Sequence, residues 1–142
     1  MNSIKNSSYY KEIIDELSFP FGNYYLFDGF VVAEINEGIV YSWEEHGKFV
    51  SMEIASLYNN KGSNLIYITN RIYKYAIKPT DWLKFFKEKY VIKAYGIINY
   101  SKTGSKNALI EKLFMPVNVY RFTSLESAIE WAKKEKSSQD SA

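Results

Sequence analysis

The amino-acid sequence predicts a single α/β domain whose sheet is mostly parallel and opens with an antiparallel hairpin. Short runs of aromatic and β-branched residues alternate with segments whose apolar residues have helical spacing. The dipeptide Asp28-Gly29 separates two of these runs and is a strong signal for a two-residue hairpin. A length of 142 residues suits one domain that buries its own core, and the chain has no cysteine.

The N-terminal part of the chain is expected to form an extension followed by the hairpin. Residues 1–17 are the extension, where the spacing of apolar side chains favours a short helix, with an edge strand as the alternative. The hairpin strands are expected at residues 24–27 and 30–35, because Gly29 tolerates the positive φ that the turn requires.

The middle of the chain contains signals for two helices and a strand. Ser42 and Glu45 fit a capping box, in which the Ser42 side chain accepts from the Glu45 amide and Glu45 reaches back to the Ser42 amide. Residues 65–69 form a near-continuous apolar run, which is typical of a strand buried on both faces. The second helix is expected to begin at Pro79 or Thr80.

Residues 91–114 continue the alternation with a strand and a helix. The strand is expected at 91–100, where the small Ala94 and Gly96 would let a helix pack closely on the sheet. The helix is expected at 108–114. Its buried side chains are expected to be Leu109, Ile110 and Leu113.

The C-terminal part is expected to hold a last strand, a final helix and a tail. Residues 119–122 are the strand, Thr123 and Glu126 fit a second capping box, and residues 134–142 are a flexible polar tail. The predicted order is therefore β-β-α-β-α-β-α-β-α, with about five strands in a mostly parallel sheet and the helices packed on it.

Four stretches of the chain carry a resemblance to a known fold. They are residues 30–38 (FVVAEINEG), 67–71 (YITNR), 79–82 (PTDW) and 122–131 (FTSLESAIEW). The chain resembles the STAS fold of anti-sigma-factor antagonists and the related CRAL–TRIO lipid-carrier fold. It is most similar to small STAS-like proteins of Bacteroidetes. The resemblance implies one STAS-like domain over residues 18–133 of a bacterial protein. The charged residues that interrupt the first 17 positions do not fit a secretory signal, so a cytoplasmic location is expected.

The best candidate binding site follows the predicted central strand. Asn70 and Arg71 lie just beyond its carboxyl end, where open α/β sheets bind ligands. Arginine is rare in this lysine-dominated chain, which suggests a need for its planar, bidentate group. Tyr73, Tyr75 and Trp82 are expected nearby. The alternative is a structural loop in which Asn70 closes a turn and Arg71 pairs with a surface carboxylate.

Two further sites are weaker candidates. In the anti-sigma-factor antagonists a phosphorylated serine follows the central strand, and the nearest equivalent here is Thr69, whose phosphate would lie beside Arg71. A turn before the helix at 108–114 could hold an anion on free amides and lysines. Its residues are Lys102, Thr103, Ser105 and Lys106. The alternative is a solvated turn.

Other functional classes find little support in the sequence. A net charge of +2 gives no electrostatic case for nucleic acid, and no apolar run is long enough to insert into a membrane. The lone His46 is expected to be structural or exposed, and Glu34 to face solvent or to pair with a lysine or Arg71. We therefore expect no metal, no cofactor and no catalytic residues.

Two functions are compatible with these features. The first is a non-catalytic regulatory or protein-interaction module, which docks an unidentified protein through the loop after the central strand and the helix that follows. The second is a small-molecule or lipid-binding protein with an apolar pocket between sheet and helices. Either would be a monomer or a weak dimer. The aromatic content is high, at 18%. It fits an aromatic pocket, but it also fits an ordinary core in a protein from an AT-rich genome, because phenylalanine and tyrosine have AT-rich codons.

Overall fold

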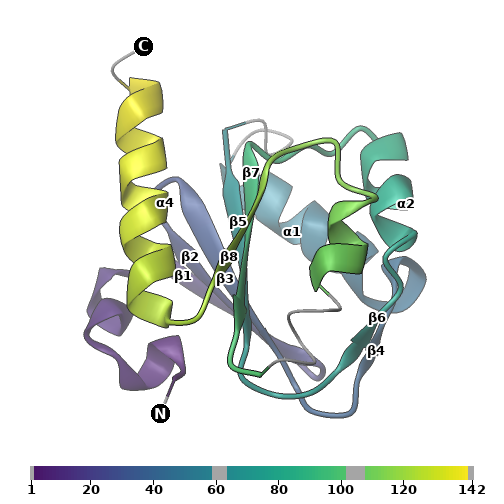
Figure 1. Cartoon of the computed structure of the whole chain (residues 1–142), viewed down its shortest axis with the longest axis horizontal. Helices are drawn as coiled ribbons and strands as arrows, with labels where there is room; N and C mark the ends of the chain where they lie inside the picture. Colours follow the sequence, from purple (N-terminus) through teal and green to yellow (C-terminus); the bar gives the residue numbers. More distant parts are fainter. Residues whose placement is uncertain (1, 59–63, 102–107, 141–142) are drawn as a thin grey trace.

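The computed structural model describes residues 2–58, 64–101 and 108–140, and it has a six-stranded mixed sheet with helices on both faces (Figure 1). The strand order is β1-β2-β3-β5-β7-β8. The pairs β1–β2 and β2–β3 are antiparallel and the other three are parallel, which confirms the predicted α/β class. The strands are β1 (Asp15–Phe19), β2 (Gly22–Phe27), β3 (Phe30–Ile35), β5 (Ile66–Arg71), β7 (Ala94–Asn99) and β8 (Val119–Phe122).

The hairpin between β2 and β3 is confirmed, although β2 begins at Gly22, two residues before the predicted start. Phe27 pairs with Phe30, so Asp28 and Gly29 are the two turn residues, and Gly29 has the expected positive φ of 86°. The edge strand β1, which pairs with β2, extends the antiparallel part of the sheet to three strands.

The N-terminal extension differs from the short helix that its apolar spacing favours. Two 3-10 turns, Ile4–Asn6 and Ser8–Glu12, precede β1, so the alternative of an edge strand holds only for the last three residues of the extension, 15–17. The physical reason is that Asp15–Phe19 satisfies its backbone groups along β2, which a short isolated helix could not match.

The first long helix begins with a modified cap. The Glu45 amide donates to Ser42 Oγ at 3.2 Å, as the capping box predicts. The return bond is not made by Glu45, however, because the Ser42 amide donates to His46 Nδ1 at 3.0 Å. The turn Trp43–Gly47 is π-helical and continues into α1 (Lys48–Tyr58). His46 therefore has a structural role in the cap.

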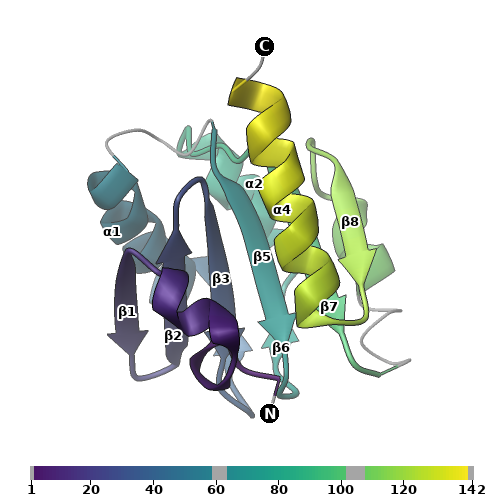
Figure 2. The same ribbon diagram turned by 90° about the vertical axis from the view of Figure 1, so that its left-hand side faces the viewer.

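The two faces of the sheet are covered by different elements. Helix α4 (Leu125–Asp140) and the N-terminal turns lie on one face, while α1, α2 (Asp81–Lys87) and the helical residues 108–112 lie on the other (Figures 1 and 2). A Cβ added to Gly96 of β7 would lie 2.8 Å from the Trp131 ring of α4, so the glycine allows the close packing that the sequence predicts. Residues 134–140, expected to be a tail, continue α4.

The helical segment 108–112 presents the opposite face from the one predicted. Ala108 and Glu111 are completely buried, whereas the three side chains expected inside are exposed. The exposed fractions are 48% for Leu109, 50% for Ile110 and 80% for Leu113. The prediction was wrong because a buried ion pair orients this segment through Glu111, as described below.

A second, two-stranded sheet connects the loops that leave β3 and β5. Its parallel strands are β4 (Val40–Tyr41) and β6 (Ala76–Ile77). Tyr41 and Ile77 project from this small sheet towards α1 and α2 and contribute to the pocket described next.

Candidate functional site

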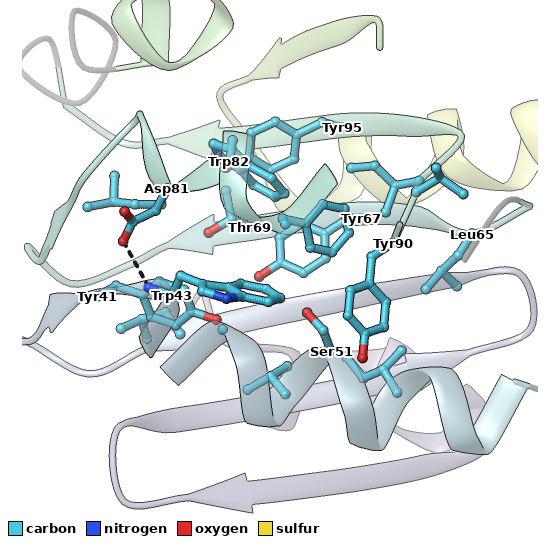
Figure 3. Close-up of a pocket in the computed structure, with 18 of the residues that line it drawn as sticks. Tyr41, Trp43, Ser51, Leu65, Tyr67, Thr69, Asp81, Trp82, Tyr90 and Tyr95 are labelled. Atoms are coloured by element: carbon cyan, nitrogen blue, oxygen red, sulfur yellow. Dashed lines mark hydrogen bonds between the residues drawn. The ribbon is translucent and has the colours of Figure 1, made fainter. Parts of the chain in front are cut away.

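A pocket lies between the main sheet and the helices α1 and α2 (Figure 3). Its volume is about 90 Å³, and it is partly open to solvent. The sheet contributes Tyr67 and Tyr95, helix α1 contributes Ile54, and α2 contributes Trp82 and Phe85. Aromatic and aliphatic carbon makes up most of the wall, which is the usual composition of a small-molecule site.

Hydroxyl groups gather where the small sheet meets the main one. Thr69 Oγ1 and the Tyr75 hydroxyl lie 2.9 Å apart, and the hydroxyls of Tyr24 and Tyr41 are 3.0 Å apart. Burial raises the pKa of Tyr24 and of Tyr67 well above the usual value. These groups therefore stay neutral around neutral pH and act as hydrogen-bonding groups rather than as bases.

The charged residues on the pocket wall are exposed or already paired. Lys78 is exposed to solvent. Asp81 Oδ2 accepts from the Trp43 amide at 2.8 Å, and Asp81 Oδ1 lies 3.5 Å from Lys84 Nζ. Figure 3 shows the bond between Asp81 and Trp43 at one end of the pocket. The bond joins the start of α2 to the start of the π-helical turn, and so fixes two pocket walls to each other.

A buried carboxylate holds two of the aromatic side chains in the pocket wall. Glu111 Oε1 accepts from the Trp82 indole at 2.8 Å and from the Tyr95 hydroxyl at 2.7 Å. Glu111 Oε2 forms an ion pair with Arg71, whose Nη2 also donates to the Tyr95 hydroxyl at 3.1 Å. Burial alone would lower the pKa of Arg71, but the neighbouring Tyr75, Tyr95 and Glu111 outweigh it and raise the pKa.

Three of the five residues predicted as a binding site come together around this carboxylate. The Arg71 guanidinium lies 5.6 Å from the centre of the Tyr75 ring, and both Arg71 and Trp82 bond to Glu111. The partner of Arg71 is therefore a completely buried carboxylate and not the surface carboxylate of the structural alternative. These side chains form the frame behind the pocket.

Asn70 points to the opposite face of the sheet and joins a different cluster. Its Nδ2 donates to Glu34 Oε2 at 3.1 Å and to the Asn2 carbonyl at 2.9 Å. Glu34 also accepts from the Ser3 hydroxyl at 2.6 Å and from the Ile4 amide at 2.8 Å. The expectation that Glu34 faces solvent or pairs with a lysine or Arg71 is thus wrong, because the N-terminal turns cover it.

The remaining candidates are Tyr73, which does not line the pocket, Thr69, which does, and four residues that lie outside the described ranges. Tyr73 is 48% exposed on the loop after β5. Thr69 is 2% exposed and its hydroxyl bonds to Tyr75, a position that gives no support to a phosphoacceptor role. The proposed anion site at Lys102, Thr103, Ser105 and Lys106 lies outside the described residues.

Sequence reasoning missed the residue on which this arrangement depends. Glu111 interrupts the apolar run at 108–114, and this interruption is the signal that could have pointed to a buried charge. Tyr67 and Trp43 carry no comparable signal, because their strand and helix patterns are those of ordinary core residues. Tyr67 and Trp43 line a pocket only because segments that are distant in the sequence pack around them.

The described residues hold neither a cluster of metal ligands nor a helix that could span a membrane. Within residues 2–58, 64–101 and 108–140, no three His, Asp or Glu side chains gather as metal ligands would. None of the helices in those ranges has the length and apolar character needed to cross a membrane.

Comparisons with protein-family models, with curated proteins and with solved structures found nothing that matches this chain. The resemblance to the STAS fold therefore stays a prediction.

Proposed function

We propose that the protein binds a small apolar molecule in the pocket between its sheet and helices α1 and α2. The observation that carries this proposal is the pocket itself, about 90 Å³ of partly enclosed space lined mostly by aromatic and aliphatic side chains. Apolar side chains that face such a space lack the van der Waals contacts that core residues make with their neighbours. A ligand that fills it restores the missing contacts.

The construction of the walls supports binding by a preformed site. The Glu111 cluster fixes Trp82 and Tyr95, and the bond from the Trp43 amide to Asp81 fixes the opposite side. Because these hydrogen bonds already hold the wall side chains in place, the side chains lose little conformational entropy when a ligand binds, which favours affinity. The proposed function is binding without catalysis.

Tryptophan indole signals provide a direct test of this proposal. Trp43 and Trp82 line the pocket, whereas Trp131 belongs to α4 and packs against Phe122 on the other face of the sheet. When toluene is titrated into the protein, the indole NMR signals of Trp43 and Trp82 should shift saturably, while that of Trp131 stays in place. Equal shifts of all three signals, or none at saturating toluene, would contradict the proposal.

A matched pair of variants on α1 separates pocket binding from surface binding. Ala55 lines the pocket, and the neighbouring Ser56 is exposed on the same helix. Ala55→Phe should fill the space and abolish the toluene response, while Ser56→Phe should leave it intact. If both variants bind toluene as the unmodified protein does, the pocket is not the binding site.

The docking function expected from the sequence is the second proposal. The observation in its favour is that Tyr73 and Leu83, on the predicted loop and helix, are 48% and 54% exposed. Asn70 and Arg71 are occupied in buried clusters, so the docking surface would consist of their exposed neighbours. A pull-down from a native lysate should lose its partner with the double variant Tyr73→Ser/Leu83→Ser. Recovery of the same proteins by the variant, or of none by either, would count against docking.

A further inference from the structure

Two side-chain hydroxyls reach the pocket from opposite walls. Tyr67 lies on β5 of the sheet and Ser51 on α1, and Figure 3 shows the Ser51 side chain pointing across the pocket towards Tyr67. Neither hydroxyl has a hydrogen-bond partner within the part of the chain that the structure describes, whereas Thr69 and Tyr75 satisfy each other. Unpaired hydroxyls in an otherwise apolar wall are suited to fix one polar group of a ligand.

The size and the walls of the pocket favour a single flat ring. Apolar cavities of roughly 150 Å³ bind benzene, so a volume of about 90 Å³ leaves room for no more than one ring. The ring of Trp82 stands edge-on to that of Tyr67, at 6.0 Å between centroids and 84° between planes. Aromatic walls in this arrangement offer both faces and edges to an aromatic guest.

The surroundings of the two hydroxyls favour an uncharged guest. Lys78 is exposed, and Asp81 is paired with the Trp43 amide and Lys84, so neither places an uncompensated charge inside. An ionised ligand group that enters the apolar interior would lose its hydration, and among the described residues the only cation on the wall, Lys78, is at the exposed rim. The raised pKa of Tyr67, caused first by burial, reflects the same penalty on charge.

We infer that the pocket takes a neutral, single-ring aromatic molecule with one hydroxyl group, and that this group hydrogen-bonds to Tyr67 and Ser51. The inference rests on the proposed function, because it names the chemical class of ligand for the same pocket. Phenol is the smallest representative of this class, toluene is its counterpart without a polar group, and benzoate is its charged counterpart.

Titration calorimetry at neutral pH with these three compounds tests the inference. The unmodified protein should bind phenol and toluene but bind benzoate more weakly than phenol. Tyr67→Phe and Ser51→Ala should each lower the affinity for phenol by about two- to tenfold, the value of one hydrogen bond. Both variants should leave the affinity for toluene unchanged, because they keep the shape of the pocket.

The outcomes distinguish this inference from the proposal on which it rests. If toluene binds but neither variant weakens phenol, or if benzoate binds more tightly than phenol, the inference is overturned and the apolar pocket remains. If no compound binds the unmodified protein, both are overturned. Should either variant unfold, the comparison of phenol with benzoate on the unmodified protein still decides, since tighter binding of benzoate contradicts a neutral ligand.

Discussion

Glu111 is the residue that connects the interior of the fold to the pocket. It is completely buried, and its oxygens accept hydrogen bonds from Arg71, Trp82 and Tyr95, which belong to three different elements. A buried ion pair contributes little net stability, because desolvation offsets the attraction between the charges. Its value here is positional, since it fixes the direction of two aromatic side chains in the pocket wall.

Removal of this carboxylate should be strongly destabilising. Glu111→Ala leaves the Arg71 guanidinium buried without its counter-charge, and we expect the free energy of unfolding to fall by about 3–5 kcal/mol. Urea denaturation measures this change. The matched control is Glu44→Ala, which removes the pair of Glu44 with Lys84 on the surface, where both side chains are at least half exposed. A loss for Glu111→Ala no larger than that for Glu44→Ala would refute this role.

At the scale of the element, Glu34 attaches the N-terminal turns to the sheet. Its carboxylate accepts from the Ile4 amide and the Ser3 hydroxyl, and the Ile4 side chain is completely buried among the core residues under α4. The extension is therefore a part of the folded domain, held by hydrogen bonds to the strand residues Glu34 and Asn70 and by apolar side chains that include Ile4.

Glu34→Ala should release these turns. The Ile4 amide loses its acceptor inside the protein, so the free energy of unfolding should fall by about 1–3 kcal/mol. Hydrogen exchange at the Ile4 amide should accelerate while exchange in β7 changes much less. Glu37→Ala, at an exposed position shortly after β3, is the control. Unchanged exchange at Ile4 in the Glu34 variant would show that the carboxylate does not hold the turns.

Elements governed by neighbouring residues could be predicted from the sequence, and those governed by distant partners could not. The turn at Asp28-Gly29 follows from local chemistry and is confirmed. The close approach at Gly96 is also confirmed, because the missing side chain is itself the signal, although its partner Trp131 lies far along the chain. The orientation of residues 108–112 depends on Arg71, which lies far away in the sequence, so helical spacing alone gave the wrong face. The pocket is also non-local, because it forms only where Tyr67, Trp43 and their counterparts on α2 meet.

At the scale of the whole molecule, buried tyrosines make the fold sensitive to alkali. Burial raises the pKa of Tyr24, Tyr67 and Tyr95 well above the usual value, and raises the pKa of Tyr25 and Tyr100 to about 12. The folded state therefore keeps protons that the unfolded chain loses near pH 10. The resulting stability is fully present below that pH and is lost as the pH rises towards the folded values.

We expect the urea midpoint to be unaffected by these tyrosines below pH 9 and to fall progressively between about pH 10 and 12. Tyrosinate absorbance of the native protein should over the same range report fewer ionised groups than the 13 tyrosines of the unfolded chain. A native titration with all tyrosines ionising together near pH 10, and no loss of stability, would show that these side chains are not buried as the fold requires.

The central claim is that the space between the sheet and helices α1 and α2 is a ligand site. A crystal of the protein soaked in bromobenzene tests it most directly, because anomalous scattering locates the bromine without reference to any assumed binding mode. The account predicts a bromine peak inside the pocket between Tyr67 and α1, and no such peak in crystals of Ala55→Phe. Bromobenzene that binds elsewhere on the protein while the pocket stays free of it would contradict the account.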